Sequence, residues 1–339
     1  MVEKKRILIT GASGFIGGYL VDEALRRGYD VCAGVRSGSS RRNLLDKRIS
    51  FIDLHYDDKE ALTKQLINVV AVRGAWHYVI HNAGITKTLN TTDFYKINAL
   101  YTYKLIEALS EAGCKPEKFL LMSSLSSFGP INDFSSRPIR PDDEQLPDSI
   151  YGKSKLEAEL FVKAQIYFPY VILRPTGVYG PGDRDYLTVI KNIKYGFDIK
   201  VGMKPQNITF IYVKDLAVAT FLALENNSVY NNSYFVADGD VYTDNEFAAI
   251  VKRLLGKRFV FNIRIPLCIC YFVCICSEVL GNIFGKVMVL NTDKYKILKQ
   301  RNWICETEPI RKELFFIPKY NLKEGLEETI RCSREHGQL

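Results

Sequence analysis

Histidine is scarce in this chain, which has only four among its 339 residues. Transition metals are bound mainly by histidine, cysteine and carboxylate side chains, and the eight cysteines form no paired C-x-x-C half-sites, so the sequence predicts no metal site. Eight cysteines are also too few to make a small disulfide scaffold of a chain this long. Because reduced cysteines fit the reducing cytosol, we expect a cytoplasmic protein.

A long uncharged hydrophobic run is also missing. The basic start Lys4-Lys5-Arg6 leads into only a short apolar stretch, which argues against a signal peptide. The best membrane candidate, Ile265–Ser277, has 13 uncharged residues, whereas about 20 are needed to cross a bilayer. We therefore expect no spanning segment and interpret this run as a core or lid helix. Its four cysteines are interpreted as small buried hydrophobic residues, namely Cys268, Cys270, Cys274 and Cys276.

The net charge of +8 is not concentrated in a basic stripe. Lysine and arginine are scattered, and the densest runs are Lys4-Lys5-Arg6 and Arg41-Arg42. Nucleic-acid binding usually requires a basic patch, often interleaved with aromatic residues, so no nucleic-acid partner is expected. A phosphate-bearing cofactor or substrate accounts equally well for a local positive patch.

The first half of the chain alternates short β-branched runs with helical patterns, which is typical of a parallel sheet covered on both faces. The predicted strands are Arg6–Thr10, Asp30–Val35, Ile49–Leu54, His77–His81, Lys118–Ser123 and Tyr170–Arg174. The predicted helices are Gly14–Arg27, Asp58–Val70, Thr92–Ala112 and Ser149–Phe168. Because crossovers in such sheets are right-handed, we predict an α/β fold with a doubly wound parallel Rossmann sheet, whose ligand crevice lies at the carboxyl ends of the strands.

A smaller C-terminal lobe is expected to follow this sheet. The alternation weakens after Tyr179, where the turn-forming run Gly180-Pro181-Gly182-Asp183 interrupts the chain. We predict a dinucleotide-binding domain over residues 1–178 and a mainly substrate-binding lobe over 179–339. The chain is expected to return to the sheet at about 208–237, through a strand, a helix and a second strand at Phe210–Val213, Asp215–Glu225 and Tyr234–Val236.

Three glycines follow the first predicted strand directly. Gly11, Gly14 and Gly17 have the spacing G-x-x-G-x-x-G, which permits a tight turn and a close approach of the backbone to a pyrophosphate. The helix that begins there offers free N–H groups and a partial positive charge to the phosphates. We therefore predict cofactor contacts in this turn from Thr10, Gly11, Ser13, Gly14, Phe15, Ile16 and Gly17.

The second and third predicted strands end in residues that bear on the choice of cofactor. Arg36 follows the second strand, where many NAD-binding sheets carry an acidic residue for the ribose. A guanidinium suits a 2′-phosphate, so NADP(H) is favoured and NAD(H) stays possible; the alternative is a solvated loop arginine. Asp53, beside Leu54, either accepts a hydrogen bond from the adenine amine or caps the next turn.

Tyr151 and Lys155 stand at positions i and i+4 of a predicted helix and therefore share one face. A nearby ammonium favours the phenolate, so we expect the pKa of Tyr151 to be lowered from its usual value of about 10. Such a tyrosine acts as a general acid or base near neutral pH. The alternative is a pair of ordinary surface residues.

Together these motifs resemble the extended short-chain dehydrogenase/reductase family of the NAD-dependent epimerase/dehydratase type, with its T-G-x-x-G-x-x-G and Y-x-x-x-K signatures. The resemblance implies that Ser124, with Ser126 as the fallback, helps to hold the substrate oxygen beside Tyr151 and Lys155. It gives Asn98 a structural role. It implies further cofactor contacts from Asn82, Ala83, Gly84, Ser123, Tyr151, Lys155, Pro175, Thr176, Gly177 and Val178. It implies weaker substrate contacts from Thr86, Ser126 and Tyr179.

The same machinery serves several reactions on a small-molecule substrate. Ser124-Leu125-Ser126 contains no acid, which argues against a dehydratase. The apolar segment Ile263–Leu290 resembles the C-terminal lobes of the 3β-hydroxysteroid dehydrogenase and dihydroflavonol reductase branches, whose substrates are bulky and apolar. We therefore expect an oxidoreductase that interconverts a secondary alcohol and a ketone. The alternatives are a nucleotide-sugar epimerase with tightly bound NAD and a non-catalytic dinucleotide-binding redox sensor.

The resemblance also implies a possible homodimer, because members of this family often pair through a four-helix bundle. Its contact helices would be Thr92–Ala112 and Ser149–Phe168.

Overall fold

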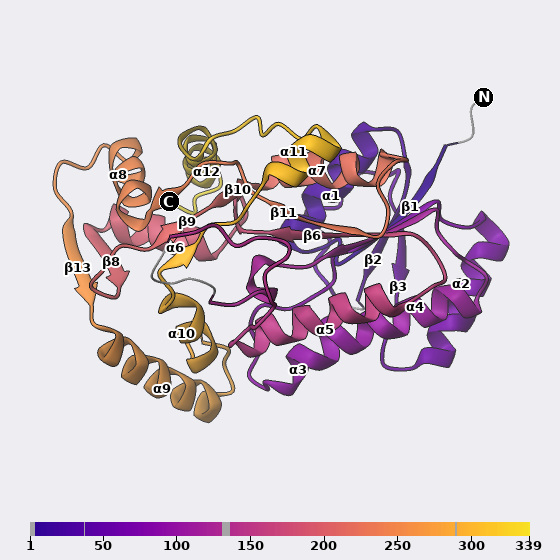
Figure 1. Ribbon diagram of the computed structural model, residues 1–339, viewed down its shortest axis with the longest axis horizontal. Coiled ribbons are helices and arrows are strands. Elements are labelled where there is room, and N and C mark those ends of the chain that lie inside the picture. Colours follow the sequence, from indigo (N-terminus) through magenta and orange to yellow (C-terminus); the bar gives the residue numbers. More distant parts are fainter. Residues whose placement is uncertain (1–3, 37, 131–135, 289) are drawn as a thin grey trace.

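The main feature of the molecule is a parallel sheet of seven strands in the order β11-β6-β5-β4-β1-β2-β3 (Figure 1). The computed structural model describes residues 4–36, 38–130, 136–288 and 290–339. The strands of this sheet are β1 (Arg6–Thr10), β2 (Asp30–Val35), β3 (Ser50–Asp53), β4 (Tyr78–His81), β5 (Lys118–Met122), β6 (Tyr170–Pro175) and β11 (Asn232–Val236). The strand order runs in opposite directions on the two sides of β1 and confirms the predicted doubly wound sheet.

Helices cover both faces of the sheet because its strands are apolar on both sides. Ile7 and Ile9 of β1 belong to one hydrophobic core, and Leu8 between them belongs to the other. The first core is completed by α1 (Phe15–Arg26), α7 (Val213–Glu225) and α11 (Glu308–Leu314). The second is completed by α2 (Lys59–Arg73), α4 (Tyr101–Glu111) and α5 (Ile150–Ala164). Figure 1 shows these two layers above and below the sheet.

Two of the predicted helices differ from the observed ones. The predicted helix Thr92–Ala112 is divided into α3 (Thr92–Phe94), a π-helical turn at Tyr95–Leu100, and α4. A π turn widens the helix locally, which hydrophobic periodicity does not reveal. The predicted helix Ser149–Phe168 ends at Ala164, because Gln165 is extended and its side chain bonds to the backbone of Tyr167 and Phe168.

The chain leaves the main sheet after β6 and builds a second lobe of short strands and helices. Its strands form three small sheets from β7 (Gly177–Tyr179) with β10 (Phe210–Tyr212), β8 (Phe197–Val201) with β13 (Phe261–Ile265), and β9 (Asn207–Ile208) with β12 (Tyr242–Thr243) and β14 (Asn302–Trp303). Its helices are α6 (Asp185–Lys194), α8 (Asp244–Leu254), α9 (Leu267–Phe284), α10 (Thr292–Leu298) and α12 (Leu322–Glu335). The chain rejoins the main sheet through α7 and β11. The predicted strand at Phe210–Val213 does not join that sheet, because it forms β10, which pairs with β7. The domain boundary at residue 178 stays a prediction.

The apolar segment is interpreted from its sequence as a core or lid helix, and the structure rules out the core helix. It folds as α9, an 18-residue helix in which only Cys270, Cys274 and Gly281 are buried. Cys268 and Cys276 are exposed, so the interpretation as buried hydrophobic residues is wrong for these two cysteines. Among the residues that the structure describes, α9 is the one helix long and apolar enough to cross a membrane by length and composition.

Candidate active site

A cleft of about 1500 Å³ opens at the carboxyl ends of the strands, between the sheet and the second lobe. It exceeds the usual range of small-ligand pockets, roughly 300–1,000 Å³, and so has room for a dinucleotide together with a substrate. Most of the residues predicted from the sequence line it: Gly11, Ser13, Gly14, Phe15, Ile16, Arg36, Leu54, Asn82, Ala83, Gly84, Thr86, Ser123, Ser124, Ser126, Tyr151, Lys155, Pro175, Thr176, Gly177 and Val178.

The glycine-rich turn fits a dinucleotide because it leaves no space for side chains. A Cβ atom on Gly17 would lie 2.1 Å from the carbonyl oxygen of Gly11, so helix α1 packs directly on the turn. Gly11 itself has a φ of +65°, which favours glycine. The N-cap of α1 is Gly14, which has no side chain to cap the first N–H groups. No side chain caps these donors, and Gly14, Phe15 and Ile16 line the cleft, where a phosphate would accept from them.

A buried histidine fixes this end of the cleft. The Nδ1 atom of His81 lies 2.9 Å from the hydroxyl of Thr10, and its Nε2 atom lies 3.0 Å from the hydroxyl of Thr102. Burial lowers the pKa of His81 to about 3, so the ring is neutral at physiological pH. The Thr10 hydroxyl in turn accepts from the N–H of Ala83 at 3.1 Å. His81 thus holds the β4 turn against the glycine-rich turn, and Thr10 acts from behind the wall of the cleft.

Four predicted site residues do not line the cleft, namely Thr10, Gly17, Asp53 and Tyr179. Thr10 and Gly17 pack directly behind its wall. Asp53 ends β3, where its carbonyl accepts a hydrogen bond from Gln65. Tyr179 is buried completely in the second lobe, and its hydroxyl donates to the carbonyl of Asn321 at 3.2 Å. The predicted substrate contact of Tyr179 is therefore wrong, because its ring belongs to the lobe's aromatic core.

Helix α5 presents Tyr151 and Lys155 to the cleft from its first turns. The helix is capped by Ser149, whose hydroxyl accepts from the N–H of Gly152 at 3.0 Å. The Lys155 ammonium is buried and donates to the carbonyl of Met122 at 2.9 Å, at the end of β5. Ser124 follows on the same edge and hydrogen-bonds to the Tyr151 side chain. The three predicted catalytic residues therefore share one wall of the cleft.

The pKa of Tyr151 differs from the sequence-based expectation. Burial raises the pKa of this phenol, and the hydrogen bond from Ser124 opposes the rise only in part. Lys155 does not lower it, because its ammonium is turned toward the Met122 carbonyl. Burial lowers the pKa of Lys155 to about 8, against the opposing charge of Glu159. At pH 7 the chain thus presents a neutral phenol beside a positively charged amine, an arrangement suited to proton donation.

A buried ion pair that sequence reasoning missed supports this wall. Glu159 is fully buried and lies 2.7 Å from the guanidinium of Arg174, itself almost fully buried. Its carboxylate also accepts from the hydroxyls of Ser123 at 2.5 Å and Ser127 at 2.9 Å, on either side of Ser124. The spacing of four residues from Lys155 to Glu159 was the available signal, because it continues the face that begins at Tyr151.

Asn98 joins the catalytic helix to the cofactor end of the cleft from within the π turn. Its side chain accepts from the N–H of Ile85 at 2.8 Å and donates to the carbonyl of Ile85 at 3.0 Å. It also donates to the Ser154 hydroxyl at 2.9 Å. The residue therefore fixes the segment after Gly84 against α5, which agrees with the structural role implied for it.

The second lobe contributes Asp293, on α10, to the start of the catalytic helix. Its carboxylate accepts from the N–H of Ile150 at 2.5 Å and from the N–H of Tyr151 at 3.2 Å. A carboxylate at a helix N-terminus also interacts favourably with the helix dipole. No local pattern marks Asp293, because it lies 142 residues from Tyr151 in the sequence.

Comparison with known proteins agrees with this geometry. The model of the NAD dependent epimerase/dehydratase family matches residues 7–237 of the chain. The chain belongs to this family. The resemblance to extended short-chain dehydrogenases is thus confirmed, and the protein is an NAD-dependent enzyme by family.

Relatives of this epimerase/dehydratase family member include both epimerases and dehydrogenases. The UDP-glucose 4-epimerase of Vibrio cholerae is 24% identical over 331 residues, which cover 96% of this chain and 94% of the relative. The 3-beta-hydroxysteroid dehydrogenase of Mycolicibacterium neoaurum is 27% identical over 274 residues, which cover 77% of this chain and 72% of the relative. The structure of the Thermotoga maritima UDP-glucose 4-epimerase has a TM-score of 0.77 and 21% identity, with 98% and 99% of the two chains covered.

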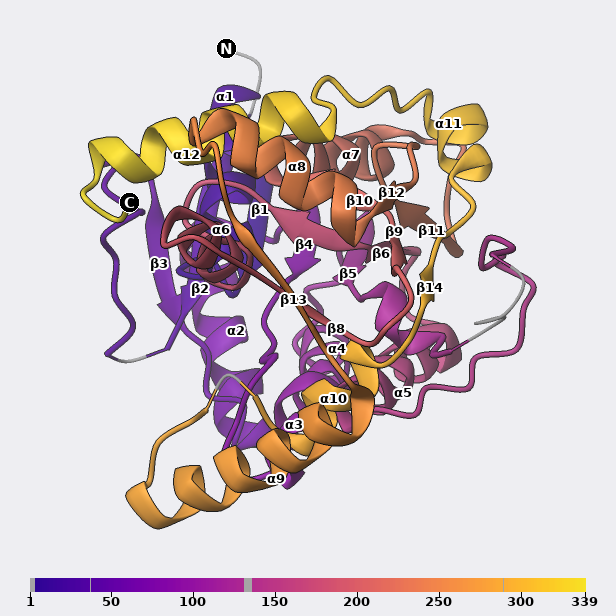
Figure 2. The same ribbon diagram turned by 90° about the vertical axis from the view of Figure 1, so that its left-hand side faces the viewer.

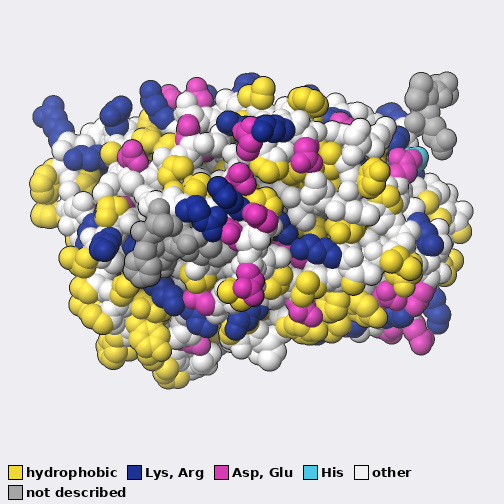
Figure 3. Space-filling model, in the orientation of Figure 1, with side chains coloured by type: hydrophobic (Ala, Val, Ile, Leu, Met, Phe, Trp, Pro, Cys, Tyr) yellow, Lys and Arg dark blue, Asp and Glu magenta, His cyan; other side chains and the backbone are white. Residues whose placement is uncertain are grey.

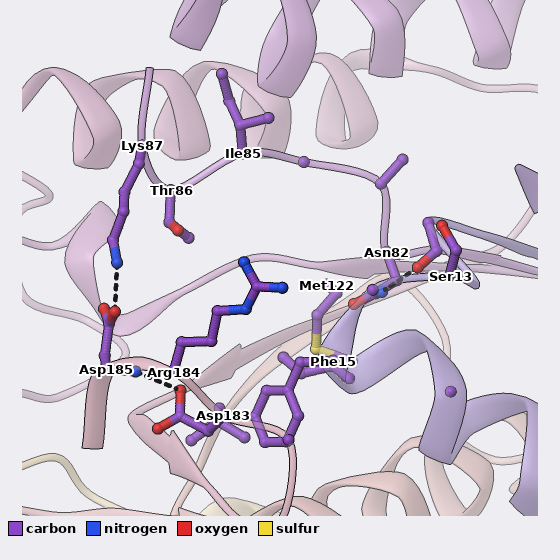
Figure 4. Close-up of a pocket in the computed structure, with 18 of the residues that line it drawn as sticks. Ser13, Phe15, Asn82, Ile85, Thr86, Lys87, Met122, Asp183, Arg184 and Asp185 are labelled. Carbon is purple, nitrogen blue, oxygen red and sulfur yellow. Dashed lines mark hydrogen bonds and ion pairs between the residues drawn. The ribbon is translucent and has the colours of Figure 1, made fainter. Parts of the chain in front are cut away.

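The substrate end of the cleft in this family member is polar and charged. Arg184 extends into the pocket toward Ile85 and Thr86, as Figure 4 shows, and its guanidinium has no ion-pair partner among the residues that the structure describes. Next to it, Asp185 pairs with Lys87 and, at 3.4 Å, with Lys294 of α10. None of the described residues of 263–290 lines the cleft. The resemblance of this apolar segment to lobes that bind bulky, apolar substrates is therefore not matched by a place in the cleft wall.

Proposed function

We propose that the protein is an NADP-dependent oxidoreductase that interconverts a secondary alcohol and a ketone. The observation that carries the proposal is the shared wall of Ser124, Tyr151 and Lys155, with a neutral phenol at its centre. It lies in one continuous cleft with the glycine-rich turn, so a substrate and a dinucleotide would meet there.

Each of these residues has a role in ketone reduction. When bound, the reduced cofactor supplies a hydride to the carbonyl carbon. Tyr151 would donate its phenolic proton to the carbonyl oxygen, so that the product is a neutral alcohol. Ser124 would hold that oxygen with a second hydrogen bond. Lys155, positively charged at pH 7, would stabilise the phenolate left on Tyr151 once its ammonium turned from the Met122 carbonyl toward that oxygen. Alcohol oxidation runs the same proton transfer in reverse.

The preference for NADP is supported by the residues around the second strand's end. Arg36 lines the cleft there, together with Ser39, Ser40, Arg42 and Asn43. Two guanidinium groups and three neutral hydrogen-bonding side chains suit a 2′-phosphate better than an unmodified ribose. Arg41, between them in the sequence, instead lies over the ring of Phe51 at 4.3 Å.

Replacing Arg36 with alanine should weaken NADPH binding by about 10- to 100-fold, the effect of losing a charge-assisted hydrogen bond of about 1.5–3 kcal/mol. The affinity for NADH should change little. Fluorescence titration with both cofactors measures the two effects, and Arg41→Ala is the matched control because its guanidinium stacks on Phe51. Equal losses for NADPH and NADH would contradict the 2′-phosphate contact.

A nucleotide-sugar epimerase is the second candidate, and Arg184 is the observation that favours it. This exposed guanidinium extends into the substrate end of the cleft, where an anionic diphosphate would pair with it. The epimerases among the relatives give this reading further support. A redox sensor without catalysis would have no need for the proton-donating wall around Tyr151.

Incubation with NADPH and a panel of ketones, and then with UDP-sugars and NAD, separates these functions. Net oxidation of NADPH with formation of an alcohol is the expected result. An isomerised sugar without net change of cofactor would replace the proposal with the epimerase. Tight cofactor binding with neither product would favour the sensor.

Two further inferences concern where and how the protein works. All eight cysteines are free thiols, which supports the reducing cytosol as its location. The proposed homodimer would use the outer faces of α4 and α5, where Tyr103 and Leu160 are exposed. A homodimer stays a prediction that light scattering can test.

A further inference from the structure

Helix α9 carries its apolar residues on the side that faces away from the protein. Its packed stripe consists of Cys270, Cys274 and Gly281. At 100° per residue, the opposite side carries Ile269, Phe272, Val279 and Ile283, all of them exposed. An ordinary surface helix has charged or polar residues there. An apolar outer face costs free energy in water, so something other than water is expected to cover it.

The apolar surface extends beyond one helix. Figures 1 and 2 place α9 along an edge of the molecule, and Figure 3 shows hydrophobic side chains gathered over it. The strand β13 leads directly into α9 and adds the exposed ring of Phe261, which stacks on the exposed Phe197 of β8. We call this area, from β8 and β13 through α9, the α9 surface. It does not form part of the cleft.

Charge distinguishes the partners that this surface fits. Between residues 257 and 290 the chain has four basic residues and a single acidic one, Glu278. The carboxylate of Glu278 accepts hydrogen bonds from the N–H and the hydroxyl of Thr292. Of the basic residues, Arg264 pairs with Asp244, whereas Arg258 and Lys286 are exposed at the two ends of the segment. An apolar surface with cations at the two ends of its segment, one before β13 and one after α9, is complementary to a bilayer with anionic headgroups.

The helix cannot cross the bilayer in this fold, although it is about 27 Å long at 1.5 Å per residue. The segment before it, β13, pairs with β8, and the segment after it supplies Asp293 to the start of the catalytic helix. Crossing would place these two neighbours on opposite sides of the membrane. A helix whose two flanks pack on the same body lies in the plane of the interface instead.

We propose that the α9 surface docks the protein on an anionic lipid bilayer as a peripheral membrane enzyme. Exposed apolar side chains of α9 enter the boundary between headgroups and acyl chains, and Arg258 and Lys286 contact the anionic headgroups. The next helix, α10, contacts α9 through the rings of Tyr271 and Tyr295, 5.0 Å apart, and gives Asn291, Asp293 and Lys294 to the neighbourhood of the cleft. Docking would therefore hold one side of the cleft near the membrane surface.

Vesicle flotation of the full-length protein tests this proposal without any knowledge of the substrate. We expect the protein to float with vesicles of phosphatidylcholine and phosphatidylglycerol, less with phosphatidylcholine alone, and less at high salt. The double variant Phe272→Gln, Ile283→Gln should lower the bound fraction at least tenfold. The matched control is Ile166→Gln, Ile317→Gln, because these two side chains are even more exposed than Phe272 and Ile283 but lie outside the α9 surface; it should float like the wild type.

Two measurements keep the result interpretable. Both double variants should bind NADPH and unfold thermally like the wild type, which shows that the fold is intact. Light scattering in the absence of lipid gives the oligomeric state. Failure of the wild type to float with anionic vesicles would overturn the proposal. So would loss of a dimer in the α9 variant but not in the control, because the surface would then be an interface between two copies of the chain.

Discussion

Replacing Tyr151 with phenylalanine is expected to lower turnover by about 10²- to 10⁴-fold, the usual contribution of a general acid or base. The variant loses the proton that the substrate oxygen needs, whereas the ring keeps its place beside Phe94 and the wall of the cleft. The affinity for NADPH should stay close to that of the wild type. Steady-state assays with the substrate found in the ketone panel, together with fluorescence titration of NADPH, measure the two quantities.

The matched control for this experiment is Tyr230→Phe, which removes the same hydroxyl from an exposed site between α7 and β11. Its turnover should equal that of the wild type. Should Tyr151→Phe retain wild-type turnover, the proton would have to come from another group, and the role of the whole wall of Ser124, Tyr151 and Lys155 would have to be revised. An equal loss of NADPH affinity would instead indicate a damaged cofactor site.

The sheet and the cofactor turn could be predicted because they depend on local patterns. Buried parallel strands are continuous apolar runs, and each is followed by a helix of different periodicity. The glycine spacing follows from contacts within a few residues, such as the one between Gly17 and Gly11. Because the strands are parallel, the residues at their carboxyl ends lie along one edge of the sheet. This explains why so many of the predicted residues line the cleft.

The remaining features depend on contacts that a single sequence does not show. The pKa of Tyr151 is decided by burial and by the direction of the Lys155 ammonium, not by the spacing of the two residues. Asp293 reaches the catalytic helix from a distant part of the chain. Apolar composition suggested a core or lid helix, but composition does not say which neighbour covers a helix, and the protein leaves α9 largely exposed.

Removing the carboxylate of Glu159 is expected to destabilise the fold strongly. The free energy of unfolding should fall by about 3–5 kcal/mol, as for other broken buried ion pairs. In Glu159→Ala the Arg174 guanidinium stays buried without its partner, and the hydroxyls of Ser123 and Ser127 lose their acceptor. Denaturant unfolding measures the effect. The control Glu157→Ala removes a carboxylate from a neighbouring position of α5 that is only partly buried, and it should change stability by less than about 0.5 kcal/mol.

The charge, rather than the volume, of Glu159 is expected to account for this loss, and pH separates the two. Burial alone would raise the pKa of Glu159, but its hydrogen bonds with Arg174 and the charge of that guanidinium hold the pKa below the usual value. A carboxylate with a lowered pKa in the folded state stabilises the fold above its unfolded pKa of about 4.3, and this stabilisation is lost as the pH falls through the folded pKa. The difference between the wild type and Glu159→Ala should therefore be complete above about pH 5 and shrink in more acidic solution. A difference that persisted unchanged at low pH would assign the loss to packing.

A second substitution tests the role of charge at the same site. Adding Arg174→Met to Glu159→Ala should recover part of the stability, because no unpaired charge then remains buried.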